Sequence, residues 1–139
     1  MGEILLTGSF EHRLDSKGRI VLPARFRGEL GNSVVATVGF EGCVVLYPIS
    51  SWKDFENKID TLSQFKKATR DLKRAFYSSA KEQDIDSNGR IIIPAELRQY
   101  AKIDQEITIV GVQDHLEIWA SEHWKEYSER KQKYETGHN

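Results

Sequence analysis

A block of thirteen residues occurs twice in this chain of 139 residues, and no other feature constrains the fold as much. The segment from Asp15 to Arg27 returns 71 residues later as the segment from Asp86 to Arg98, with eight of the thirteen positions identical. With one residue gained, the match continues at Val38–Gly39 with Val110–Gly111, at Leu46–Tyr47 with Ile118–Trp119, and at Trp52 with Trp124. Each copy is about 50 residues long, so the chain consists of two copies of one small module.

Local signals predict the order β-turn-β-α-β-β in both modules. In the first, Leu6, Phe10 and Leu14 alternate with polar neighbours as in a half-buried strand, and residues 15–18 supply a turn with glycine where positive φ is needed. Pro23 fits the start of a helix because its missing N–H costs nothing there. The remaining expected elements are a strand over 19–22, a helix to about 30, and hairpins formed by 34–38 with 43–47 and by 107–110 with 116–119.

The segment between the modules has no counterpart, and its pattern predicts a helix. Thr61 and Gln64 form a capping-box pair. One helical face then carries Phe65, Ala68, Thr69, Leu72, Ala75 and Phe76, and a polar strand is expected over 77–85. We therefore divide the chain into a first module (5–57), a helical connector (58–77), a second module (78–129) and a C-terminal tail (130–139).

The predicted fold class is α+β. A module of about 50 residues buries too little surface to be stable alone, because even a 60-residue domain buries only about 60% of its unfolded surface. We expect the two modules to pair about a pseudo-twofold axis and to share one barrel-like core, with the connecting and C-terminal helices outside it. Trp52 and Trp124, at matching positions, are expected in the core.

Each repeated block places an aspartate and an arginine four residues apart across a Ser-x-Gly turn: Asp15 with Arg19, and Asp86 with Arg90. In one interpretation the aspartate caps the turn and the arginine is a surface partner. In the other, the carboxylate orients a guanidinium fork toward phosphate oxygens or the O6/N7 edge of guanine. The recurrence of arginine directly after glycine favours the second, because turn chemistry does not require it.

Charge is unevenly distributed although the net charge is only −1, from 20 basic and 21 acidic residues. This balance gives no support for a general polyanion binder. Basic side chains surround the first turn: His12, Arg13, Lys17, Arg19, Arg25 and Arg27. The second turn has Asn88 in place of Lys17 and is flanked by acidic side chains: Glu82, Asp84 and Glu96. We expect the first turn to be the better polyanion surface.

The doubled Asp-x-x-x-Arg signature, followed each time by three aliphatic residues and Pro-Ala, with a tryptophan after each hairpin, closely resembles the MraZ proteins, which are tandem SpoVT/AbrB-like domains. The resemblance runs from about Leu5 to Glu129. It implies swapped-hairpin AbrB-type folding, ring-shaped homo-oligomers, and bacterial transcriptional regulators that bind short direct repeats in the promoter of the division and cell-wall gene cluster. The family signature falls on Asp15 with Arg19 and on Asp86 with Arg90.

Our leading hypothesis is a sequence-specific DNA-binding regulator, acting as a repressor. Its expected partners are double-stranded DNA with repeated promoter sites and further copies of the chain in a ring. The DNA-binding residues are expected to be Arg13, Asp15, Lys17 and Arg19, with Asp86, Asn88 and Arg90 as a secondary set. The alternative is a ring-forming structural or protein-partner-binding module of antitoxin-like type, which the low net charge and the acidic second half favour.

Other classes of function find little support. Cys43 is the only cysteine, so neither an intramolecular disulfide nor a thiolate cage for zinc is expected. The four histidines show no metal-ligand spacing, and no phosphate-binding glycine motif occurs, so we expect no metal, no cofactor and no enzymatic activity. No stretch approaches the roughly 18 apolar residues of a membrane span. The expected location is the cytoplasm, on the nucleoid.

Overall fold

Residues 4–137 are described by the computed structural model, and side chains for residues 4–130. The first module contains β1 (Ser9–Arg13), β2 (Arg19–Val21), α1 (Ala24–Leu30), β3 (Ser33–Val38), β4 (Val44–Pro48) and α2 (Ile49–Asp60). After α3 (Lys67–Ser79), the second repeats this order with β5 (Lys81–Asp84), β6 (Arg90–Ile92), α4 (Ala95–Tyr100), β7 (Glu106–Gly111), β8 (Leu116–Ala120) and α5 (Ser121–Gly137). The α+β class and the order β-turn-β-α-β-β are confirmed. None of the helices described is both long and apolar enough to cross a membrane.

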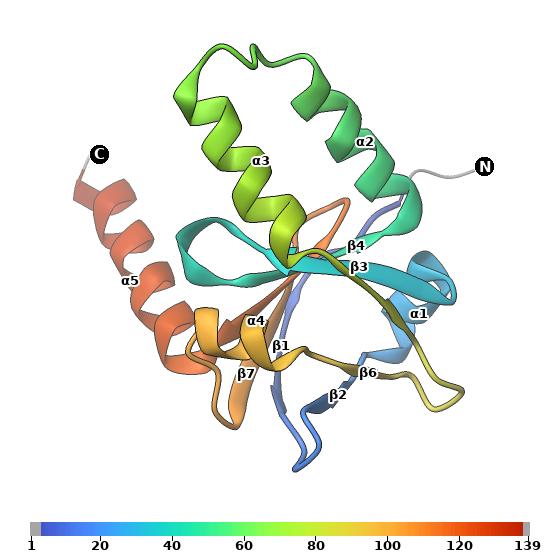
Figure 1. The fold of residues 1–139 in the computed structure, drawn as a ribbon. Helices are drawn as coiled ribbons and strands as arrows, with labels where there is room; N and C mark the ends of the chain where they lie inside the picture. Colours follow the sequence, from blue (N-terminus) through green and yellow to red (C-terminus); the bar gives the residue numbers. More distant parts are fainter. Residues whose placement is uncertain (1–3, 138–139) are drawn as a thin grey trace.

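The strands of the two modules interleave (Figure 1). One antiparallel sheet has the order β1-β7-β8-β4-β3-β5, and β2 pairs with β6 in a separate two-stranded ribbon. At the middle of each sheet, a residue of the first module pairs with its own counterpart in the second: Val45 opposes Glu117, and Ile20 opposes Ile91. The two modules are therefore related by a pseudo-twofold axis, and each lends its first strand to the sheet edge of the other.

The strands of the described chain form no closed barrel, which corrects the expected barrel-like core. After the turns that follow β1 and β5, the chain leaves the large sheet, and β2 and β6 pair with each other instead of extending its edges. The main core lies between this ribbon, α1, α4 and one face of the sheet. It includes Ile20 and Ile91 from the ribbon, Phe26 from α1 and Leu97 from α4, all at most 2% exposed.

The other face of the large sheet is covered by helices. Cys43, Val45, Tyr47 and Trp119 form a second buried cluster. Trp52 of α2 and Trp124 of α5 pack against it but are only partly buried, whereas Trp119 is 1% exposed. Both predicted tryptophans therefore cover the core, and the fully buried indole is the one at the end of a strand.

The connector differs from its prediction. Helix α2 continues to Asp60, and the hydroxyl of Thr61 donates a hydrogen bond to the carbonyl of Lys58 (2.7 Å) rather than capping the next helix. Phe65 is 96% exposed in the loop before α3. The expected apolar face reduces to Thr69, Leu72 and Phe76, because Ala68 and Ala75 are exposed. Since α3 runs to Ser79, β5 is shorter than expected.

The hairpin register corrects one part of the sequence alignment. Val38 opposes Val44, and Gly111 opposes Leu116, which is the counterpart of Val44. Val38 therefore corresponds to Gly111 and not to Val110. The second module has gained one more residue before its hairpin and has lost one in the hairpin loop, which keeps the same strand face toward the core.

Candidate nucleic-acid interface

The two Asp-x-x-x-Arg segments form the same turn. Oδ1 of Asp15 accepts hydrogen bonds from the backbone N–H groups of Lys17 (2.8 Å) and Arg19 (2.9 Å). Gly18 has φ +76°, a conformation that other residues adopt only with strain. In the second turn, Oδ1 of Asp86 accepts from the N–H groups of Asn88 and Arg90 at 2.9 and 2.8 Å. The aspartate thus builds the turn from within.

The same aspartate also orients the arginine. Nε of Arg19 donates to Oδ2 of Asp15 at 2.8 Å, and Nε of Arg90 donates to Oδ2 of Asp86 at 2.8 Å. Hydrogen bonds from the backbone and guanidinium of each arginine hold the pKa of the aspartate below its usual value, so the carboxylate stays charged. Both sequence interpretations are therefore compatible, because one carboxylate group shapes the turn and holds the guanidinium.

The outer face of the ribbon carries both arginines. Ile20 and Ile91 point into the core, so the alternate residues of β2 and β6 lie on the opposite face. That face contains Arg19 and Val21 from β2 and Arg90 and Ile92 from β6. The side chains of Arg19 and Arg90 are 27% and 35% exposed, and Val21 and Ile92 are 44% and 49% exposed. Figure 1 shows the ribbon on the side of the large sheet opposite α2 and α3.

The remaining predicted residues lie around these turns without joining the ribbon face. Arg13 ends β1, and its guanidinium contacts Glu106 (2.7 Å) and donates to the side-chain oxygen of Gln105 (2.9 Å). Lys17 and Asn88 are exposed at the tips of the turns. No hydrogen bond or ion pair within the described residues engages the ammonium group of Lys17. The structure therefore leaves Lys17 available to an anion, whereas Arg13 would have to leave an exposed ion pair.

Two members of the expected basic patch lie elsewhere. Cζ of Arg25 lies 5.4 and 5.3 Å from the ring centroids of Phe10 and Phe26, and its guanidinium donates to the hydroxyl of Thr7. Arg25 therefore makes its contacts within the first module. Arg27 lies beside Gly89, and its counterpart Arg98 lies beside Gly18. Each arginine therefore borders the turn of the other module, which sequence distance alone did not indicate. The only signal was that the repeat retains arginine at the last position of the block.

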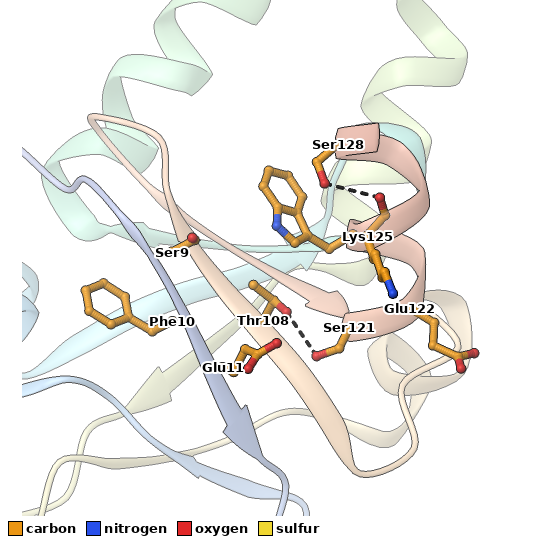
Figure 2. A pocket seen from close by; sticks show the side chains of 9 residues that line it. Ser9, Phe10, Glu11, Thr108, Ser121, Glu122, Lys125 and Ser128 are labelled. Carbon is orange, nitrogen blue, oxygen red and sulfur yellow. Dashed lines mark hydrogen bonds between the residues drawn. The ribbon is translucent and has the colours of Figure 1, made fainter. Parts of the chain in front are cut away.

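A groove between β1 and α5 is separate from the ribbon and holds about 420 Å³ (Figure 2). Three of the hydroxyl groups that line it are engaged with neighbours: Thr108 hydrogen-bonds to Ser121 (2.9 Å), and Ser128 donates to the carbonyl of Lys125 (3.2 Å). The described residues contain no group of three or more metal-ligating side chains. Burial raises the pKa of Cys43, so its thiol stays protonated. The arrangement that stands out chemically is the pair of oriented arginines.

Comparison with known proteins found a matching family model and similar proteins from several bacteria. The family model described as "MraZ protein, putative antitoxin-like" matches it twice, over residues 5–75 and 76–138. A protein of Thermoanaerobacter pseudethanolicus named transcriptional regulator MraZ is 46% identical over 89% of this chain and 87% of its own length. A protein of the same name from Lactiplantibacillus plantarum is 47% identical over 86% of this chain and 85% of its own length.

Proposed function

We propose, from the premise that this chain belongs to the MraZ family, that it regulates transcription by binding duplex DNA in a sequence-specific manner through the outer face of the β2–β6 ribbon. Its targets are direct repeats in the promoter of the division and cell-wall gene cluster, and it acts there as a repressor. The protein works in the cytoplasm, on the nucleoid. A regulator of this kind is a binding protein and not an enzyme.

The observation that carries this proposal is the pair of aspartate-held arginines on one exposed ribbon face. Arg19 and Arg90 each commit Nε to a carboxylate, which leaves the two Nη groups to bind a ligand. A guanidinium that is already oriented loses less rotational freedom when it binds the planar O6/N7 edge of guanine or two phosphate oxygens. Orientation by Asp15 and Asp86 therefore supports recognition of nucleic acid rather than a purely structural role.

The shape of the ribbon supports the same ligand. The major groove of B-DNA admits a two-stranded β-ribbon, and several DNA-binding proteins read it that way. Val21 and Ile92 lie beside the arginines and present apolar surface of the kind that contacts thymine methyl groups. In this arrangement the arginines read base edges, and Lys17 at the tip of its turn contacts the phosphate backbone.

The two ends of the ribbon are unequal, which suits direct repeats. The first turn carries Lys17, whereas the second has Asn88 and follows a β5 strand that contains Glu82 and Asp84. Each chain therefore has a strong and a weak end and binds DNA in one direction. In a homo-oligomeric ring, neighbouring copies would present this face in the same direction, and linked sites raise the apparent affinity through their effective concentration.

A fluorescence-anisotropy titration tests the proposal, with a duplex taken from the repeated region upstream of the protein's own gene. Arg19→Ala is expected to weaken binding by about 100-fold or more, because a bidentate contact to a base contributes about 1–3 kcal/mol in each of several bound copies. Arg90→Ala should have a smaller effect. Arg74→Ala, on the exposed face of α3, is the matched control, and size-exclusion chromatography should show an unchanged oligomer. Equal binding by wild type and Arg19→Ala would overturn the proposal.

The acidic surroundings of the second turn favour one other candidate, a ring that binds a protein partner. The two candidates differ in their dependence on salt. When a protein neutralises phosphates on duplex DNA, the logarithm of the affinity falls linearly with the logarithm of the salt concentration, with a slope of about −0.9 per phosphate. A flat profile between about 50 and 200 mM salt would support the protein partner.

A further inference from the structure

Each Asp-x-x-x-Arg turn is covered by an arginine from the other module. A Cβ atom placed on Gly18 would lie 3.0 Å from Cζ and 3.1 Å from Nη2 of Arg98, which belongs to α4. A Cβ atom placed on Gly89 would overlap the guanidinium of Arg27, which belongs to α1. Each guanidinium therefore lies at the place that a side chain would occupy at a glycine of the opposite turn.

The antiparallel pairing of β2 and β6 explains this crossing. Because Arg19 opposes Ile92, the first turn lies where β6 ends and α4 begins. The carbonyl of Gly18 accepts a hydrogen bond from the N–H of Ile93 (2.9 Å), and the carbonyl of Gly89 accepts one from the N–H of Leu22 (2.9 Å). The helix that follows each ribbon strand therefore starts beside the turn of the other module.

Arg27 and Arg98 also donate Nε to a partner in the protein, but to a backbone carbonyl rather than to a carboxylate. Nε of Arg98 donates to the carbonyl of Ile93 at 3.0 Å, and Nε of Arg27 donates to the carbonyl of Leu22 at 3.2 Å. Among the described residues, neither arginine has a carboxylate within ion-pair distance, and no hydrogen bond engages their Nη groups. Each therefore commits one edge to the protein and leaves its Nη groups for another ligand.

Two guanidinium groups consequently flank each turn: Arg19 and Arg98 at the first, and Arg90 and Arg27 at the second. Within the described residues, only one arginine of each pair lies within ion-pair distance of a carboxylate: Arg19 of Asp15, and Arg90 of Asp86. Neighbouring like charges repel each other, and an anion placed between them removes this repulsion. Phosphate oxygens accept hydrogen bonds from arginine in the required geometry.

We propose that Arg98 and Arg27 each complete the DNA site of the opposite module by contacting a backbone phosphate beside Arg19 and Arg90, respectively. This inference rests on the proposed function. Both side chains are partly buried with their guanidinium groups against a glycine, so they reach the rim of the groove and not its floor. They position the duplex and carry no sequence preference.

A double-mutant cycle on DNA binding tests whether each of these arginines acts together with the arginine of the opposite turn. Arg98→Gln should weaken binding about tenfold, as expected for loss of a hydrogen-bonded charged contact, on both the promoter duplex and a scrambled one. The salt slope should fall by about 0.9 per copy bound. The effect of Arg98→Gln should depend on whether Arg19 is present and should be additive with Arg90→Ala. Arg27→Gln should show the reverse pattern, being coupled to Arg90.

Controls separate this inference from its premise. Arg74→Gln is the matched surface variant and should bind as wild type does. Arg98→Lys keeps the positive charge and most of the aliphatic side chain, so it should recover part of the DNA affinity. If Arg98→Gln lowers the melting temperature, Arg98→Lys should restore it to the wild-type value. Coupling of Arg98 to Arg90, or binding by Arg98→Gln equal to that of Arg74→Gln, would refute the crossed assignment. Absence of DNA binding by the wild-type protein would instead refute the proposed function.

Discussion

Replacing Gly89 by alanine should destabilise the protein through two separate effects. At φ +76° the new methyl group is strained, at a cost of about 1–2 kcal/mol for a residue with a side chain. The methyl group would also displace the guanidinium of Arg27 and break its hydrogen bond to the carbonyl of Leu22, which contributes about 0.5–1.5 kcal/mol. Together these effects predict a loss of about 1.5–3.5 kcal/mol.

Two other glycines calibrate this value. Gly18 has the same φ, but a Cβ atom there lies 3.0 Å from the flexible end of Arg98, so Gly18→Ala should cost only the strain, about 1–2 kcal/mol. Gly28 lies within α1 and a Cβ atom there meets nothing within 4 Å. Gly28→Ala should therefore stabilise the protein by about 0.5–1 kcal/mol, because alanine favours a helix.

Urea unfolding at one fixed protein concentration measures all three variants, and the midpoints can be compared where the slopes are equal. The expected order of stability is Gly28→Ala, wild type, Gly18→Ala and Gly89→Ala. If Gly89→Ala were as stable as Gly28→Ala, the turn would not need its left-handed glycine. If Gly18→Ala and Gly89→Ala lost the same stability, the closer contact between Arg27 and Gly89 would have no energetic weight.

Two further predictions concern titratable groups away from the ribbon, the partly buried His115 and the buried Cys43. Burial lowers the pKa of His115, but hydrogen bonds and charges from Glu117 and Asp114 outweigh it and raise the pKa overall. This group therefore contributes stability that is fully present below its unfolded pKa of about 6.5 and is lost as the pH rises through the higher folded pKa. The difference in urea midpoint between wild type and His115→Gln should therefore shrink as the pH is raised above about 6.5, and a constant difference would contradict this. Because burial keeps the Cys43 thiol protonated, it should react with a thiol reagent only when the protein unfolds, and Cys43→Ala should leave DNA affinity unchanged. Rapid labelling of the native protein would argue against this burial.

The elements that could be predicted from the sequence are those set by local chemistry. The turn at residues 15–18 needs only an aspartate that can accept backbone hydrogen bonds and a glycine at positive φ, and both are visible in the sequence. Pro23 directly precedes α1, as expected from its fixed φ. The same reasoning holds in the second copy, which explains why the order of elements was predicted correctly in both modules.

The pairing of the strands could not be predicted in this way. β1 pairs with β7 and β5 pairs with β3, and such contacts depend on which apolar faces are buried together rather than on neighbouring residues. The start of the connecting helix was mispredicted for a related reason, although the helix itself is present as α3. A helical period placed Phe65 on a buried face, but the chain turns between α2 and α3, and the ring of Phe65 lies in solvent. Periodicity does not show where a helix begins when tertiary contacts decide it.

The candidate site was predictable to the same extent. The aspartate-held arginines follow from spacing alone, whereas the position of Arg98 beside Gly18 depends on the pairing of β2 with β6. A sequence-based patch therefore assigned Arg27 to the nearer turn, which is the wrong one. The charge around each turn is the same as in the sequence-based patch, because Arg98 lies at the first turn in place of Arg27, and Arg27 lies at the second in place of Arg98. The difference between the two ends still rests on Lys17 and the acidic residues near the second turn.

The crossing also gives a physical reason why the second turn remains intact in acidic surroundings that suit DNA poorly. The first turn receives from the second module a backbone hydrogen bond from Ile93 and the guanidinium of Arg98. Both depend on β6 staying paired with β2, and β6 begins directly after the second turn. Disrupting the turn at Asp86 would therefore shift the parts that hold the first turn. The second turn therefore supports the position of the first, in addition to presenting Arg90 on the ribbon face.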